Sequence, residues 1–265
     1  MPLAEALLEL QELTRRLRRE CPWDREQTVR TIVPHTVEEA YEVADAANAG
    51  DRAKLLDELG DLLFQTYFLS LLLEEEGAGD LEQVARVVHA KLVRRHPHVF
   101  GDAEAETAGR VRERWEAIKS EQEGRVGVFH DVPVSLPALA HARKLQRRAA
   151  AVGFDWPDLV GPLAKLREEL GELEQATALA PAPEPEREPD PEVFHEIGDV
   201  LFSIVNLARK LNVDPELALR ATSRRFVQRV ETAERLASDA GTIWPELDLN
   251  AQERWYVEAK RRLER

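Results

Sequence analysis

The chain contains an internal duplication, which restricts it to a fold that builds the same helical pattern twice. Residues 7–24 resemble residues 139–156, because both are arginine-rich amphipathic patterns that end in a short segment containing Trp and Pro or Gly. Further matches follow in the same order along the chain: 38–46 with 168–173, 55–64 with 193–202, 93–100 with 223–230, and 114–119 with 254–260. Each copy is therefore expected to form the same supersecondary unit.

Both copies are predicted to be helical. Ala, Leu, Glu and Arg dominate, and aromatic residues make up only 6% of the chain, which is typical of helices rather than sheets. Apolar residues recur at i, i+3 and i+4 within 55–73, and again within 193–205. We predict an all-α fold of two tandem helical-bundle domains, residues 1–124 and 136–265, joined by a linker at 125–135.

The second copy is longer than the first between its acidic motifs. Glu169 lies 130 positions after Glu39, whereas Asp199 lies 138 positions after Asp61. The extra residues fall in a segment rich in Pro and Glu, 176–192. Because proline removes helix donors and favours extended chain, we predict a mobile surface connection there.

Each copy carries the acidic pattern Glu-Glu-x-x-Glu followed by Glu-x-Gly-Asp. Its residues are Glu38, Glu39, Glu42, Glu58 and Asp61 in the first copy and Glu168, Glu169, Glu172, Glu196 and Asp199 in the second. Residues three or four apart share one face of a helix, so two antiparallel helices bring four carboxylates into one volume. Converging carboxylates repel unless a cation lies between them, and ligand sets made only of oxygen suit Mg²⁺ or Mn²⁺. The pattern predicts a divalent-cation site in each copy.

Two other interpretations compete with a magnesium site. Acidic residues on a helix often form only a solvated face, but these border an apolar stripe. A glycine also lies in the middle of each helix, Gly60 and Gly198, where it predicts the close approach of another group. The pair Glu192 and His195 matches the Glu-x-x-His motif of di-iron bundles, yet residues 54–57 of the first copy do not, which disfavours a di-iron centre.

Charge and cysteine content restrict the partners and the compartment. A formal net charge of −14 disfavours non-specific binding to nucleic acid or to an anionic membrane. No stretch approaches the roughly 18–20 apolar residues of a membrane span. The single cysteine, Cys21, excludes an intrachain disulfide, and the N-terminal residues lack a signal-peptide pattern, so we expect a cytoplasmic protein. A Gly-rich phosphate loop and a Ser–His or Cys–His pairing are not evident either, which disfavours P-loop chemistry and a covalent nucleophile.

Several runs of residues resemble the MazG family of all-α nucleoside triphosphate pyrophosphohydrolases, in its tandem-domain bacterial form. They extend through nearly the whole chain and comprise residues 21–28, 38–43, 57–65, 91–102, 136–156 and 196–211. The resemblance implies hydrolysis of NTPs and dNTPs of broad base range to a monophosphate and pyrophosphate. It also implies Mg²⁺ as cofactor, with Mn²⁺ as a substitute, and a homodimer.

The resemblance also implies that the second copy is the principal active site. Its metal ligands are then Glu169, Glu172, Glu196 and Asp199, and Glu168 orients or activates the attacking water. The implied nucleotide-binding residues are Lys165, Glu168, Glu192, His195, Arg225 and Arg229, with either Trp255 or Tyr256 stacked on the base. The carboxylates of the first copy are complete, so Glu39, Glu42, Glu58 and Asp61 form a second possible site. The rival functions are a pyrophosphatase of narrow specificity and a regulatory nucleotide-binding protein.

Overall fold

The computed structural model describes residues 2–101, 127–130, 132–182 and 188–264. It divides the chain into two compact units, Met1–Gly124 and Arg125–Arg265. The described residues form helices and turns and contain no β-strand, so the predicted all-α fold class is confirmed. Within these residues, no helix is both long enough and apolar enough to cross a membrane.

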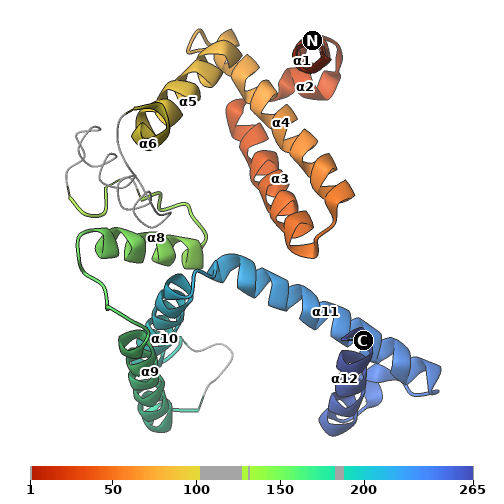
Figure 1. Ribbon diagram of the computed structural model, residues 1–265. Coiled ribbons are helices and arrows are strands. Elements are labelled where there is room, and N and C mark those ends of the chain that lie inside the picture. Colours follow the sequence, from red (N-terminus) through yellow and green to blue (C-terminus); the bar gives the residue numbers. More distant parts are fainter. Residues whose placement is uncertain (1, 102–126, 131, 183–187, 265) are drawn as a thin grey trace. The chain divides into compact units, whose positions relative to one another are not determined.

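The first unit is built around a helical hairpin. In the part of this unit that the structure describes, the helices are α1 (Pro2–Glu20), α2 (Pro22–Glu26), α3 (Val29–Ala49), α4 (Arg52–Glu75), α5 (Leu81–Arg95) and α6 (Pro97–Phe100). α3 and α4 lie side by side, and α1 packs against α4 (Figure 1). The hairpin buries a small apolar core of Ile32, Phe68 and Leu72. The carboxylates of Glu39 on α3 and of Glu58 and Asp61 on α4 lie close together on the same hairpin.

Local signals fix the ends of the α3–α4 hairpin. At the start of α3, Thr28 Oγ1 accepts a hydrogen bond from Thr31 N at 3.3 Å, and Thr31 Oγ1 accepts one from Thr28 N at 2.8 Å. α3 ends at Ala49 and is capped by Gly50, whose φ of 71° lies in the left-handed region that glycine adopts most easily. Asp51 then caps α4 by accepting a hydrogen bond from Lys54 N at 3.0 Å. Two residues are therefore enough to reverse the chain.

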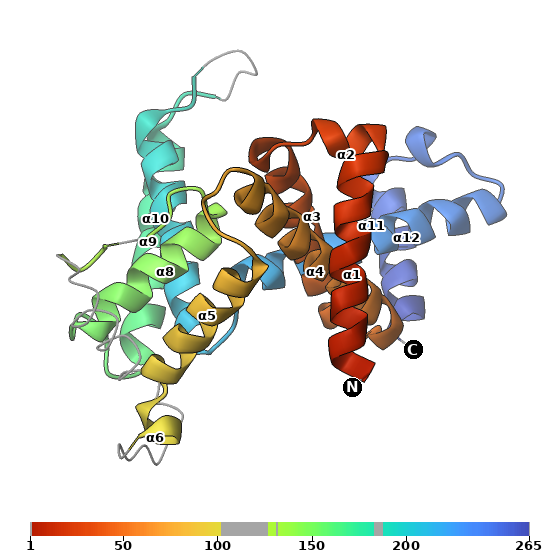
Figure 2. The ribbon, with the colours of Figure 1, turned by 90° about the horizontal axis from the view of Figure 1, so that it is seen from above.

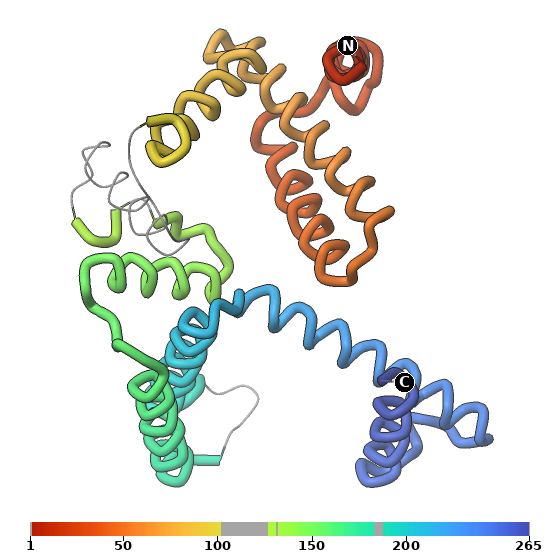
Figure 3. Tube along the Cα trace, in the orientation of Figure 1, coloured from red at the N-terminus to blue at the C-terminus, as the bar shows by residue number. Residues whose placement is uncertain are grey.

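The second unit repeats the hairpin and adds a second packing group. Its elements are α8 (Ala138–Ala151), α9 (Val160–Leu179), α10 (Pro191–Lys210), α11 (Pro215–Asp239), the 3₁₀ helix η1 (Trp244–Glu246) and α12 (Leu249–Leu263). α9 and α10 form the hairpin, and α8 packs against α10 (Figure 2). The trace in Figure 3 shows α11 leading from this group to α12, where Ala233, Leu236 and Ala259 form a separate core.

The proline-rich connection is shorter than the predicted 176–192. α9 continues through Leu179 and α10 begins at Pro191, so the connection comprises 180–190. The helix ends where it does because Ala180 precedes a proline, which disfavours helical geometry, and it adopts an extended ψ of 147°. Residues 183–187 lie outside the described chain, as do the repeat segment 114–119 and residues 125, 126 and 131 of the predicted linker.

A row of large apolar side chains on α10 remains exposed within this chain. The exposed fractions are 46% for Ile197, 48% for Leu201, 45% for Phe202 and 44% for Ile204, whereas Val205 is buried. The apolar periodicity of the sequence therefore predicts the helix correctly, but much of its apolar surface has no partner within the described chain. A contiguous apolar face of this kind is typical of an interface.

Candidate active site

The α9–α10 hairpin brings three of the predicted carboxylates together. Glu169 lies on α9, and Glu196 and Asp199 lie one turn apart on α10. One carboxylate oxygen from each residue lies within 4.8 Å of the other two. Glu169 is only 5% exposed, so most of its solvation by water is lost. Repulsion between carboxylates this close is strong in a partly buried setting.

Glu172 lies one turn after Glu169, beside these three residues rather than within the group. A side-chain hydrogen bond with Glu169 raises the pKa of Glu172, and the negative charge of Glu196 adds to the effect. Two carboxyl groups form a hydrogen bond only when one of them carries a proton. A divalent cation bound at this position would instead favour the deprotonated form of both carboxyl groups.

Lys165 supplies the nearest positive charge to the acidic group. Its Nζ lies 2.7 Å from Glu168 Oε1 and 2.7 Å from Glu169 Oε1. These hydrogen bonds raise the pKa of Lys165 above its ordinary value, so the ammonium form is strongly favoured. The lysine predicted to bind phosphate thus lies at the carboxylates, paired with the residue predicted to orient water.

The acidic group has the chemistry of a divalent-cation site. Glu196 Oε2 is buried and has no hydrogen-bond partner in the described part of the chain. A buried carboxylate oxygen without a partner is costly, whereas coordination of a hard cation would satisfy it. The ligand set consists only of carboxylate oxygens from two packed helices, which suits Mg²⁺ or Mn²⁺ better than softer metals.

The first unit carries the corresponding group. Glu39 on α3 and Glu58 and Asp61 on α4 place ligand oxygens within 4.8 Å of one another. Burial raises the pKa of Glu39, followed in effect by the charges of Asp61, Glu42 and Glu58. Here the counter-charge is weaker, because Lys54 Nζ lies 3.5 Å from Glu58 Oε1. Glu42 thus affects the group electrostatically without belonging to the three convergent residues.

The two mid-helix glycines, Gly60 and Gly198, have no close neighbour among the described residues. A Cβ atom added at Gly60 or Gly198 would meet no other described atom within 4 Å. No described group of this chain therefore makes the close approach that these glycines predict. Both glycines face open space, at an entropic cost of about 1 kcal/mol each relative to alanine.

The remaining predicted residues do not belong to the three converging carboxylates. Glu192 and His195 have exposed side chains in the first turns of α10. Arg225 donates to Thr222 Oγ1 at 2.8 Å, and Arg229 forms an ion pair of 2.9 Å with the C-terminal segment.

Both candidates for the base-stacking aromatic belong to the α11–α12 group. Trp255 and Tyr256 pack against its apolar core. Tyr256 also contacts Phe226, with ring centroids 6.1 Å apart. α11 and α12 thus form a packing group distinct from the α9–α10 hairpin that bears the carboxylates.

A cavity that the sequence did not indicate adjoins the carboxylates of the second unit. Its volume is about 560 Å³, and Lys165, Glu169 and Asp199 form part of its lining. Residues of α8, α10, the segment before α9 and the segment 127–130 complete the wall: Phe129, Leu145, Gln146, Ala149, Phe154, Asp155, Trp156, Phe202, Ser203, Asn206 and Arg209. Phe154 and Trp156 lie in the repeated segment 139–156, which the sequence singles out without indicating that its aromatic rings line a cavity.

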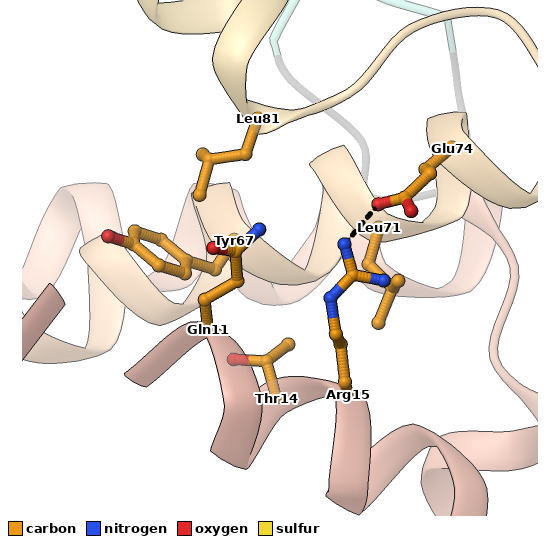
Figure 4. A pocket seen from close by; sticks show the side chains of 7 residues that line it. All are labelled: Gln11, Thr14, Arg15, Tyr67, Leu71, Glu74 and Leu81. Carbon is orange, nitrogen blue, oxygen red and sulfur yellow. Dashed lines mark hydrogen bonds and ion pairs between the residues drawn. The ribbon is translucent and has the colours of Figure 1, made fainter. Parts of the chain in front are cut away.

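The first unit has a much smaller pocket between α1 and α4 (Figure 4). Its volume is about 10 Å³, roughly the space of one water molecule. Arg15 donates to Glu74 at 2.6 Å across it, beside Thr14 and Tyr67. The two units therefore share the acidic motif, but the described pocket beside the hairpin is much larger in the second unit than in the first.

The chain is thus an all-α protein whose two helical hairpins each hold three converging carboxylates. The model of the MazG nucleotide pyrophosphohydrolase domain matches residues 27–100, which include the acidic group of the first unit. A nucleoside triphosphate pyrophosphohydrolase of Escherichia coli K12 is 41% identical over 244 residues, covering 91% of this chain and 90% of that protein.

Two further relatives extend the similarity. The nucleoside triphosphate pyrophosphohydrolase/pyrophosphatase MazG of Thermotoga maritima is 40% identical over 245 residues, 91% of this chain and 89% of its own length. YabN of Bacillus subtilis is 34% identical over 242 residues, 91% of this chain and 48% of its own length. The chain belongs to the MazG family of nucleotide pyrophosphohydrolases, as the sequence motifs predicted, and is thus a member of an enzyme family.

Proposed function

We propose that this protein hydrolyses nucleoside triphosphates of broad base range to a nucleoside monophosphate and pyrophosphate, with Mg²⁺ as its cation. The observation that carries the proposal is the buried, unpartnered Glu196 Oε2 within the group formed with Glu169 and Asp199. Relatives that match nine-tenths of the chain bear the name of this activity. The net charge of −14 disfavours a nucleic-acid or anionic-membrane partner, and the single cysteine fits a cytoplasmic enzyme.

The second unit is proposed as the main catalytic site. Glu169, Glu172, Glu196 and Asp199 hold the cation, which when bound neutralises the polyphosphate and lowers the pKa of water. Glu168 orients the attacking water and accepts its proton. The water oxygen bonds to the α-phosphorus, the α–β phosphoanhydride bond breaks, and pyrophosphate leaves.

Lys165 fits the proposed role of a phosphate contact. It is already held 2.7 Å from two carboxylates, and a triphosphate offers the same ammonium group further negatively charged oxygen acceptors. Releasing Glu168 from this ion pair frees its carboxylate for the water. Glu192 and His195 stay proposed nucleotide contacts at the start of α10.

We further propose two domains, 1–124 and 136–265, joined at 125–135, and a homodimer as the active form. The exposed apolar row of α10 supports the dimer, because burying it removes several large side chains from water. Arg225 and Arg229 then reach the polyphosphate from α11 of a second copy. The same arrangement would bring Trp255 and Tyr256 near the site.

The test is hydrolysis of each common NTP and dNTP with Mg²⁺ in ¹⁸O-labelled water, with products separated by ion exchange. The two units offer matched variants, Glu172→Gln and Glu42→Gln. We expect equimolar monophosphate and pyrophosphate, with ¹⁸O on the monophosphate, and loss of activity only in Glu172→Gln. Loss only in Glu42→Gln would move the site to the first unit.

Two other results would overturn the proposal. Diphosphate with orthophosphate would mean attack at a different phosphorus. Nucleotide binding without turnover in Mg²⁺ or Mn²⁺ would favour a regulatory binding protein instead.

A further inference from the structure

In the second unit, α11 is joined to the hairpin through a short elbow, residues 211–214. Asn212 lies in the left-handed region, with a φ of 58°, and reverses the chain after the last turn of α10. Asp214 then starts α11, because its Oδ1 accepts a hydrogen bond from Leu217 N at 3.1 Å. The elbow is therefore held by specific contacts up to the first turn of α11.

Beyond the elbow, most of α11 has no buried residue. Pro215 is buried at its start, and Ala233, Leu236 and Ala237 are buried near its end, where α12 packs on it. None of the residues 216–232 is buried. α11 extends from the hairpin to α12 with this long exposed stretch between them (Figure 1). The direction of the stretch relative to the hairpin is therefore determined at the elbow.

An ion pair connects the elbow to α8. Asp214 Oδ2 lies 2.5 Å from Arg143 Nη1, while Oδ1 of the same carboxylate caps α11. The side chains of Arg143 and Asp214 are 24% and 33% exposed, so both charges are largely shielded from water. Arg143 Nε is buried and has no hydrogen-bond partner among the described residues. Because desolvation offsets much of the attraction in such a pair, it is better suited to fixing geometry than to adding stability.

The first unit does not repeat this ion pair. In the aligned repeats Arg143 corresponds to Gln11, which is neutral and cannot form it. Asp80 caps α5 as Asp214 caps α11, but it follows a turn that contains two glycines, at φ values of 69° and 156°. The ion pair thus belongs to the second unit, which is the proposed catalytic one, and not to the repeated helical pattern.

Small changes of direction at the elbow are magnified along α11. Arg225 and Arg229 lie 11 and 15 residues beyond Asp214, or roughly 16 and 22 Å at the rise of an α-helix. A change of about 10° in the direction of α11 would therefore move these two positions by roughly 3–4 Å. An arginine displaced that far loses its hydrogen bonds to a phosphate, since these bonds span only about 2.7–3.2 Å.

We propose that Arg143, acting through Asp214, is a positioning residue that directs α11 so that Arg225 and Arg229 reach the polyphosphate. The proposal rests on the proposed function, in which these two arginines contact the polyphosphate bound by a second copy. Arg143 itself touches no substrate in this arrangement. It controls nucleotide affinity only through the position of the two arginines on α11.

The test is a cycle of affinities measured by calorimetry with Mg²⁺ and α,β-methylene-ATP, which resists cleavage between its α and β phosphates. For Arg143→Met we expect the affinity to fall about 10- to 150-fold, the range for one hydrogen bond to a charged group. In a background of Arg225→Ala and Arg229→Ala, the same substitution should change the affinity by less than about twofold, because the contacts that Arg143 positions are already absent.

A conservative variant and a matched control separate positioning from stability. Arg143 donates to Asp214 through Nη1, a single contact that the ammonium group of lysine can also make, so Arg143→Lys should bind within about threefold of the unaltered protein. The control is Arg15→Met, which removes an ion pair of similar exposure between α1 and α4 of the first unit. It should leave the affinity unchanged.

Asp214→Asn provides a second variant in case Arg143→Met fails to fold, which circular dichroism will show. It keeps the cap of α11 but removes the charge that Arg143 contacts. We expect the affinity to fall about 3- to 15-fold, since a charged hydrogen bond is roughly twice as strong as a neutral one.

Two results would overturn the positioning role: unchanged affinity in both Arg143→Met and Asp214→Asn, or an equal loss in the background that lacks Arg225 and Arg229. Turnover of ATP by the unaltered protein is measured separately. Its absence would overturn the proposed function, whereas normal turnover with either of the two results above would overturn only the role of Arg143.

Discussion

The contact between Gly161 and Trp156 predicts that Gly161→Ala destabilises the protein when the indole is present but not when Trp156 is replaced by alanine. In the unaltered chain, Gly161→Ala places a methyl group 2.0 Å from Trp156 Cδ1. Carbon atoms in ordinary contact are about 3.5–4.0 Å apart, so the ring or the start of α9 must move by roughly 1.5–2 Å. Overpacking of this size costs about 1–3 kcal/mol of unfolding free energy.

Removing the indole reverses the effect. Alanine is preferred to glycine in a helix by up to about 1 kcal/mol, and Gly161 lies in the first turn of α9. In a Trp156→Ala background, Gly161→Ala therefore ranges from neutral to stabilising by up to about 1 kcal/mol. The coupling between the two positions, which is the difference between these two effects, should be about 1–4 kcal/mol.

The assay is urea unfolding of the four proteins of this cycle, followed by the helical circular dichroism signal. Equal m-values across the four would show that only stability changes. An equal effect of Gly161→Ala with and without the indole would refute the reasoning, because the clash could then not be its cause.

Three further changes have expected outcomes. Burial opposes ionisation of Asp155, but its two basic partners, Arg209 and Lys210, lower its pKa below the ordinary value. Asp155→Asn should therefore reduce the free energy of unfolding by about 1.5–3 kcal/mol at neutral pH. This difference between the two proteins should vanish as the pH falls through the pKa of Asp155 in the folded state. Mg²⁺ should raise Tm more at about pH 8 than at about pH 5, because the raised pKa values of Glu39 and Glu172 let protons compete with the cation at lower pH; an equal shift at both pH values would contradict this. Asp214→Ala removes the N-cap of α11 and the 2.5 Å ion pair with Arg143. Urea unfolding should show that the free energy of unfolding falls by about 1–2 kcal/mol. Asp214→Asn keeps the cap, so its free energy of unfolding should fall by less.

The hairpins and their carboxylates were predictable because helical spacing determines them. Glu196 and Asp199 are three residues apart, so a helix necessarily places them on one face. The stop of α9 was mispredicted because alanine and leucine at 176–179 favour helix, and only the proline after Ala180 ends it.

The cavity was not predictable, since it depends on packing between distant segments. Gln146 reads as an ordinary polar position of an amphipathic helix, and its burial follows from α8 packing on α10. Trp156 lies in an irregular segment whose position is set by Asp155 and its ion pairs with α10. The spacing of apolar residues along a sequence does not predict contacts between segments that are far apart in it.

The unequal connections of the two hairpins have a kinetic consequence. α3 and α4 are joined by residues 50–51, whereas α9 and α10 are joined by 180–190. Closing the longer loop costs about 1.5 kcal/mol more by the logarithmic law for chain closure. Local contacts form first, and the N-terminal hairpin also leaves the ribosome first. The first unit should therefore acquire amide protection before the second in pulse-labelled hydrogen exchange during refolding, and can serve as an early folded neighbour for a slower second half.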